Sequence, residues 1–196
     1  MDIVVFDGVD ELDAIGPFEV LRMAEQAGAP FEVRLVTHEP RTEVVGAHGL
    51  RFDVGGVLDA GADVVLVGGG GWLTRSPAGA WAEAERGKLP RALAEAAEGA
   101  SVMASVCTGS MLLARAGLIG GRRATTHHGA SAELEATGAV VVGDRVVDDG
   151  SVVTAAGVTS GIDLALWIVE RFASRDMADK LAAAIEYQRE RPATAP

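Results

Sequence analysis

The chain has a single cysteine, Cys107, and its surroundings form the pattern in the sequence best suited to chemistry. Residues 101–121 read SVMASVCTGSMLLARAGLIGG, so a strand-like run leads directly into the cysteine and an apolar helical run follows at once. A strand-to-helix turn this tight pushes the residue at its apex out of the sheet and beside a helix N-terminus, which is the geometry of a nucleophile elbow. The alternative is a small buried core residue.

The position beside a helix N-terminus favours a particular chemistry for this thiol. The helix dipole and free N–H groups stabilise a thiolate, which is the nucleophilic form of cysteine. The backbone N–H of Thr108 would face an oxyanion formed by attack of the sulfur. The sequence therefore predicts Cys107 as a catalytic nucleophile and Thr108 as an oxyanion or substrate-binding residue.

Asp13 is the candidate acid–base partner of this cysteine. It follows the first expected strand and precedes Pro17, which we expect to open a helix. Ligands of doubly wound sheets bind at the carboxyl ends of the strands, and both Asp13 and Cys107 are expected there. The alternative is a helix cap, in which the carboxylate accepts hydrogen bonds from unpaired backbone N–H groups.

Four consecutive glycines, Gly68–Gly71, follow an apolar strand-like run. They predict either a tight turn or a loop in which Gly70 and Gly71 supply a second oxyanion donor opposite Thr108. Leu73 stands where a dinucleotide fingerprint requires its third glycine, so the segment is not typical of a nucleotide site. No spacing among the four histidines is typical of a metal site, and we expect none; they are His38, His48, His127 and His128.

The elements that must position these residues alternate between short apolar strands and amphipathic helices. This order predicts an α/β fold with a doubly wound, mostly parallel sheet and helices on both faces. The expected strands are Ile3–Phe6, Glu32–Val36, Val64–Val67, Ser101–Ser105 and Val152–Ala155.

Helix ends and hairpins can also be read from the sequence. Expected helices open at Pro17 and Pro90, span Thr108–Ala116, begin at a capping box of Ser160 and Asp163, and cover about Asp176–Tyr187. Expected hairpins join Glu43–Val45 to Leu50–Asp53 and Val140–Val142 to Val146–Asp148. We expect one domain over residues 1–188 and a loose C-terminal tail over residues 189–196.

Composition limits the classes of function. The chain has 196 residues, 48% of them hydrophobic, with 17 basic and 28 acidic side chains and a net charge of −11, which suits one globular domain and disfavours nucleic-acid binding. The longest charge-free stretch, Gly99–Ala114, is too short and too polar to span a membrane. The N-terminus has no basic region typical of a signal peptide, and the lone cysteine fits a reducing compartment, so we expect a cytoplasmic protein without membrane contact.

Four segments resemble one known family. The stretch from Ala104 to His127, ASVCTGSMLLARAGLIGGRRATTH, resembles the cysteine elbow of the DJ-1/PfpI superfamily, and most closely its isonitrile hydratase branch. Three more segments agree in the same order along the chain: Glu11–Leu21 (ELDAIGPFEVL), Val64–Gly70 (VVLVGGG) and Ala156–Leu166 (AGVTSGIDLAL).

The resemblance implies a flavodoxin-like sheet, usually in a homodimer, in which Cys107 attacks a small-molecule substrate with Asp13 as its acidic partner. It also implies that His127 lies near the cysteine, although a core or surface position is as consistent with the residue alone. The isonitrile hydratase branch adds water to R–N≡C and releases an N-substituted formamide without a cofactor. Thr108 stands where the protease-like branch has histidine, so peptidase activity is not expected.

Two other functions are consistent with the same residues. A glyoxalase or deglycase-like enzyme would use the same cysteine to form a hemithioacetal with a reactive carbonyl compound. A non-enzymatic redox or ligand sensor would use Cys107 as an oxidisable switch.

Overall fold

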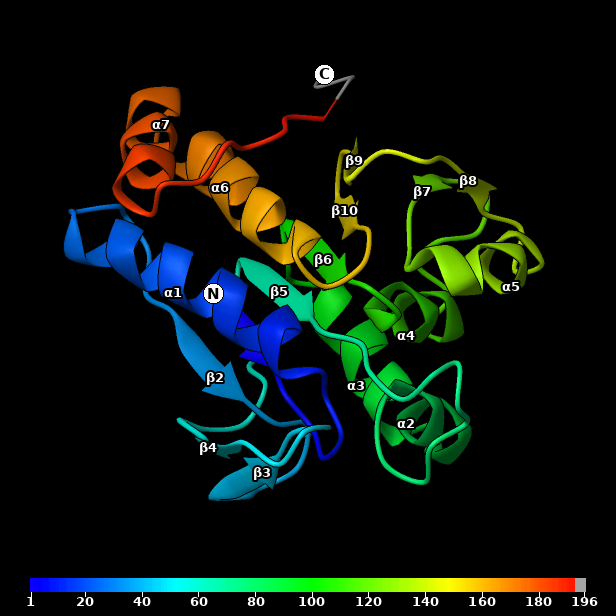
Figure 1. The fold of residues 1–196 in the computed structure, drawn as a ribbon. Coiled ribbons are helices and arrows are strands. Elements are labelled where there is room, and N and C mark those ends of the chain that lie inside the picture. The colour runs from blue at the N-terminus through cyan, green and yellow to red at the C-terminus, as the bar shows by residue number, and fades with distance from the viewer. Residues whose placement is uncertain (193–196) are drawn as a thin grey trace.

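A computed structural model describes residues 1–192 and shows a six-stranded central sheet (Figure 1). The strand order is β2-β1-β5-β6-β10-β9, in which the first five strands are parallel and β9 is antiparallel to β10. The five parallel strands follow one another in the flavodoxin-like order 2-1-3-4-5, so the expected fold class is confirmed. The strands span Asp2–Val4 (β1), Arg34–Val36 (β2), Val64–Val67 (β5), Val102–Val106 (β6), Val146–Asp149 (β9) and Val152–Ala155 (β10).

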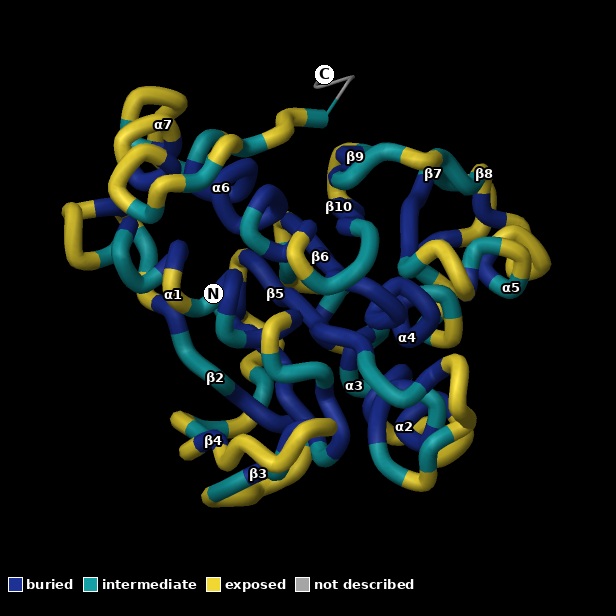
Figure 2. Tube along the Cα trace, in the orientation of Figure 1, coloured by how far each residue is buried: buried dark blue, intermediate teal, exposed yellow. Residues whose placement is uncertain are grey.

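Helices cover both faces of the sheet. On one side α1 (Glu11–Gln26), α6 (Ser160–Phe172) and α7 (Arg175–Ala184) pack together, and on the other α2 (Ala80–Arg86), α3 (Lys88–Ala97) and α4 (Gly109–Arg115) pack together (Figure 1). Strands β5, β6 and β10 are buried along their whole length, as the dark blue trace of Figure 2 shows. Their two-sided burial explains why they are apolar throughout rather than alternating. Within residues 1–192 no helix has the length and apolar character needed to cross a membrane.

Helix α1 begins earlier than expected. It starts at Glu11, its N-cap is Asp10, and Pro17 lies inside it. The Asp10 Oδ1 atom accepts a hydrogen bond from the N–H of Leu12 at 3.3 Å, which is a side-chain cap. The prediction that Pro17 opens the helix is therefore wrong, and Asp13 lies in the first helical turn rather than in the loop before it.

One of the two expected hairpins forms. Strand β3 (Glu43–Val45) pairs antiparallel with β4 (Arg51–Asp53), as expected. The second hairpin is wrong, because β8 (Val140–Val141) pairs in parallel with β7 (Arg123–Ala124), and β9 joins the main sheet. The two valines of β9 are buried in the main sheet. The Asp148 carboxylate of the same strand accepts a hydrogen bond from the indole N–H of Trp167 on α6 at 2.7 Å. Burial in the main sheet outweighs the local turn signal.

The expected capping box at the start of α6 is also absent. Ser160 is the first residue of the helix, and no side chain caps it. The Asp163 carboxylate instead is fully buried and accepts hydrogen bonds from Arg145 Nε at 2.8 Å, the Tyr187 hydroxyl at 2.8 Å and the Glu190 N–H at 2.7 Å. This carboxylate therefore joins α6 to the loop before β9 and to Tyr187 and Glu190, which follow α7.

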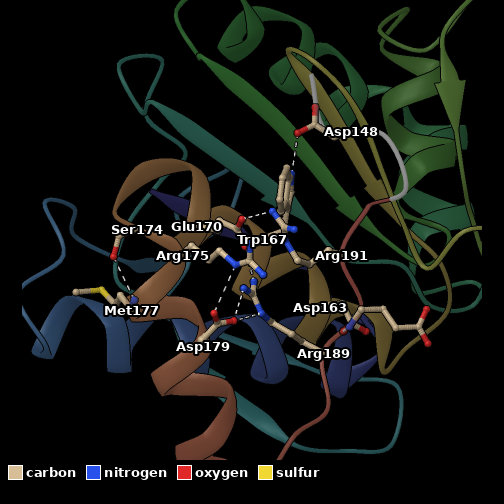
Figure 3. Close-up of polar contacts among 11 residues, drawn as sticks. Asp148, Asp163, Trp167, Glu170, Ser174, Arg175, Met177, Asp179, Arg189 and Arg191 are labelled. Atoms are coloured by element: carbon tan, nitrogen blue, oxygen red, sulfur yellow. Dashed lines mark hydrogen bonds and ion pairs between the residues drawn. The ribbon is translucent and has the colours of Figure 1, made fainter.

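The described part of the C-terminal segment is held against the domain (Figure 3). Arg189 forms an ion pair with Glu170 on α6 at 2.7 Å and donates a hydrogen bond to Asp179 on α7 at 2.9 Å, and Arg191 also pairs with Glu170. The side chain of Arg189 is only 7% exposed. The segment expected to be loose from residue 189 is thus bound through residues 189–191, and residues 193–196 lie outside the described part.

We expect Asp163→Asn to lower the free energy of unfolding by at least about 2 kcal/mol, because it leaves the Arg145 guanidinium without its buried partner. Asp176→Asn is the matched control, since its ion pair with Lys180 is 76% exposed on both sides and should contribute less than about 0.5 kcal/mol. Urea unfolding followed by circular dichroism measures both. Equal losses in the two variants would contradict the structural role of Asp163.

Candidate active site

Cys107 lies at the turn between β6 and α4, with a backbone φ of +57°. This left-handed conformation is strained for a residue with a side chain. Hydrogen bonds hold it on both sides: the Cys107 N–H donates to the carbonyls of Ala155 and Ala156 at 3.1 and 2.9 Å, and its own carbonyl accepts from the hydroxyls of Ser110 and Thr126, each at 3.1 Å. The strand, turn and helix predicted around Cys107 are therefore present.

Asp13 reaches the same site from the first turn of α1. Its side chain is fully buried, and Oδ2 accepts a hydrogen bond from the Gly69 N–H at 2.7 Å. Its other oxygen, Oδ1, is buried and has no hydrogen-bond partner among the described residues. Burial raises the pKa of the Asp13 carboxyl to about 8, although the hydrogen bond from Gly69 and, to a smaller extent, the interaction with the Cys107 side chain lower it. The carboxyl binds the glycine turn, and the helix cap is Asp10, not Asp13.

Burial works against the thiolate that the helix N-terminus was expected to favour. Cys107 is 6% exposed, and burial together with the charge of Asp13 raises the pKa of its thiol to about 12. The backbone N–H groups of Val158 and Thr108 lower this pKa, but by less. The expectation that the helix N-terminus favours a thiolate is therefore wrong for the resting site, where the thiol and the carboxyl both hold their protons near neutral pH.

The glycine turn joins the two reactive groups. Gly69 binds Asp13, and the next N–H, that of Gly70, donates to the Thr108 hydroxyl at 3.1 Å. Gly70 has a φ of +117°, and a Cβ atom there would lie 2.5 Å from the Gly8 carbonyl oxygen, so no other residue fits. The Gly70 N–H thus fixes Thr108 and is not free to bind a substrate, although both Gly70 and Gly71 line the cavity beside the sulfur.

His127 also lines this cavity. Its Nδ1 atom accepts a hydrogen bond from the Gly129 N–H at 3.1 Å, so the neutral ring carries its proton on Nε2. Burial and the neighbouring His128, whose ring centroid is 4.3 Å away, lower the pKa of His127. His127 is therefore neutral near pH 7 and has one N–H donor beyond its bond to the Gly129 loop.

The cavity beside Cys107 has a volume of about 160 Å³ and brings the predicted residues Thr108, Gly70, Gly71 and His127 to one place. Its other walls are Asp10, Trp72, Leu73, Thr74 and Val158. The sequence patterns did not indicate a place in the site for Asp10 or for Val158. The signal for Val158 was available, because it lies inside the Ala156–Leu166 segment; its φ of +42° marks it as a strained residue facing the site.

Trp72 lines the cavity and is held in place by contacts on two sides. It is 2% exposed, its indole N–H donates to Glu133 on α5 (Ser131–Glu135) at 3.0 Å, and its ring meets that of Trp81 edge to face at 5.1 Å.

Across residues 1–192 no three side chains of His, Cys, Asp or Glu gather as a metal site would require.

Comparisons with known proteins agree with this architecture. A model described as DJ-1/PfpI family matches residues 2–171. The chain is 35% identical over 190 residues to a Pseudomonas putida protein named isonitrile hydratase, covering 94% of this chain and 76% of that protein. Among solved structures, a THiJ/PfpI family protein from Pseudomonas syringae has a TM-score of 0.83 at 26% identity, covering 100% of this chain and 77% of the other. Drosophila melanogaster DJ-1beta has a TM-score of 0.77 at 21% identity, covering 95% and 97%, and shows the shared fold.

Asp13→Asn should make Cys107 more reactive above the pKa of the carboxyl. At about pH 9 the wild-type carboxylate is ionised and opposes thiolate formation, so we expect iodoacetamide to label the variant at least about threefold faster. At about pH 6 the wild-type carboxyl is protonated and the two rates should agree. Intact-protein mass spectrometry measures both rates. Glu19→Gln, an exposed carboxylate on the same helix, is the control; equal labelling of Asp13→Asn and wild type at both pH values would contradict the interaction.

Proposed function

Because this chain belongs to the DJ-1/PfpI family, we propose that it is an isonitrile hydratase-like lyase, which adds water to R–N≡C and releases an N-substituted formamide. The observation that carries the proposal is the buried pair of a thiol, Cys107, and a carboxyl, Asp13, whose pKa is raised to about 8. A carboxyl that is protonated near neutral pH can give a proton in one step and take one in the next. The similarity to the Pseudomonas putida isonitrile hydratase supports the substrate class.

The first step is addition of the thiol to the substrate. The sulfur of Cys107 bonds to the terminal carbon of the isonitrile, and one proton moves from the thiol–carboxyl pair to the substrate. The product is a thioimidate, R–N=CH–S–Cys107, and the pair keeps one proton fewer. Neither group has to carry a charge in the resting site, which suits their burial.

The second step is hydrolysis of the thioimidate. After the first step the remaining proton of the pair is on the Asp13 carboxyl, which gives it to the substrate nitrogen. The resulting Asp13 carboxylate then removes a proton from a water molecule as the water oxygen bonds to the thioimidate carbon. The C–S bond then breaks, the N-substituted formamide leaves and the sulfur regains its proton. The balance is one isonitrile and one water consumed per formamide, with no oxidant or cofactor.

Three residues around the sulfur would bind the substrate, and Gly70 would position one of them. The Thr108 and Gly71 N–H groups would hold the oxygen of the tetrahedral intermediate, while Gly70 fixes the Thr108 side chain through its hydroxyl. His127 would donate its Nε2–H to the substrate nitrogen. These roles follow from the position of each residue on the wall of the cavity.

The decisive experiment is incubation with a panel of alkyl and aryl isonitriles and detection of the formamide by mass spectrometry. We expect Cys107→Ala to abolish turnover and Asp13→Asn to lower it by about 10²-fold or more, the lower range of general acid–base contributions. Both variants should melt within a few degrees of wild type. Methylglyoxal is the competing substrate: its consumption without formamide formation would favour a glyoxalase or deglycase-like enzyme, and binding without turnover of either would favour a sensor.

We also propose that the chain forms a homodimer with an isologous two-fold contact and is cytoplasmic. The family resemblance supports the dimer, and the single thiol, which has no partner cysteine in the sequence, is consistent with a reducing compartment. Sedimentation velocity at micromolar concentration should show a species of twice the chain mass. A single species of one chain mass would contradict the dimer and leave the proposed reaction unaffected.

A further inference from the structure

A second cavity adjoins the cysteine cavity. It has a volume of about 510 Å³ and lies between the loop after β1, the turn that joins β3 to β4 and the segment before α2. The two cavities share Asp10, Gly70, Gly71 and Thr74 as walls. The cysteine cavity alone, at about 160 Å³, holds roughly five groups the size of water. A larger substrate that places its reacting carbon at the sulfur therefore extends past Asp10 into the second cavity.

The charged walls of the two cavities are acidic, and two histidines also line these cavities, His48 and His127. No lysine or arginine lines either cavity, and the carboxylates in their walls are Asp7 and Asp10. Asp7 is neutralised, because its Oδ2 atom pairs with Arg41 at 2.8 Å. Asp10 accepts only the capping hydrogen bond from Leu12 and makes no ion pair with any described residue. One carboxylate without a cationic partner thus stands at the junction of the two cavities.

The field of this carboxylate extends to the reacting groups. Asp10 raises the pKa of Asp13, of Cys107 and of His127, each as a secondary effect beside burial. A half-buried carboxylate in a cleft attracts a cation more strongly than one in open water, and it repels an anion. The Asp10 side chain is therefore positioned to attract a cationic group, and to repel an anionic one, at the junction of the two cavities.

We propose that Asp10 selects substrates with a positively charged group, an amine or a related cation, by holding that group at the junction of the two cavities while the reacting carbon meets Cys107. The inference rests on the proposed function only for the reacting group; the preference for a cation follows from the walls. Asp10 is a specificity-determining residue in this account. It does not touch the reacting atoms.

Two thiol reagents of opposite charge test the preference without any turnover. Both 2-aminoethyl methanethiosulfonate and 2-sulfonatoethyl methanethiosulfonate form a mixed disulfide with Cys107 and release methanesulfinate. Each rate is divided by the rate with a small free thiol in the same buffer. We expect the cationic reagent to be favoured by at least about tenfold at low salt, and Asp10→Asn to reduce that preference to about twofold. Asparagine keeps the helix cap, so folding is preserved.

Asp7→Asn is the matched control, because Asp7 lines the second cavity but is already paired with Arg41. It should leave the preference for the cationic reagent within about twofold of wild type. An unchanged preference in Asp10→Asn, or an equal fall in Asp7→Asn, would overturn the proposal, since the net charge of −11 would then explain the result.

A turnover measurement separates this inference from the proposed function. We expect kcat/KM for an aminoalkyl isonitrile to exceed that for the neutral alkyl isonitrile of equal length, and Asp10→Asn to remove the difference mainly through KM. If no isonitrile is turned over while the labelling preference depends on Asp10, the proposed reaction is wrong and the cation preference stands. If isonitriles are turned over with no dependence on Asp10 in either measurement, the cation preference is wrong and the reaction stands.

Discussion

The structure depends on one constraint: a thiol and a carboxyl are buried together where neither can easily ionise. Asp13 is fully buried with one oxygen unbonded, and Cys107 is 6% exposed beside it. Burial favours the neutral form of both groups, and the charge of an ionised Asp13 further opposes ionisation of Cys107. The consequence is a site that stores a removable proton near neutral pH, which an exposed aspartate could not do.

The topology brings these groups together. Strands β1, β5 and β6 are neighbours in the sheet, so the start of α1, the glycine turn and the cysteine elbow all lie at one edge. Backbones approach there so closely that a Cβ atom on Gly69 would lie within 2.5 Å of both the hydroxyl oxygen and the backbone nitrogen of Thr108. Gly69 and Gly70 bind Asp13 and Thr108 through consecutive N–H groups. The glycines are therefore needed for contact between the two halves of the site as well as for the turn itself.

Much of this arrangement could be predicted from the sequence because it depends on local patterns. Buried parallel strands are apolar throughout, and a strand that ends in a cysteine followed by a helix has few alternatives. The start of α1 could not be predicted in this way. Pro17 is typical of the first turn of a helix, but the N-cap is Asp10, seven residues earlier. The pKa of Cys107 could not be predicted either, since its direction depends on burial and on a residue 94 positions away in the sequence. The binding of residues 189–191 depends on long-range ion pairs with α6 and α7, for which a polar terminal segment gives no local signal.

The central claim is that Asp13 holds its proton near neutral pH, and a carbon-13 NMR titration of its carboxyl group tests it most directly. The chain is labelled at aspartate, and the Asp13 resonance is assigned by its loss in Asp13→Asn. We expect a chemical shift change centred near pH 8, far above the ordinary aspartate value of about 3.9. An Asp13 resonance that titrates near that ordinary value would contradict the raised pKa.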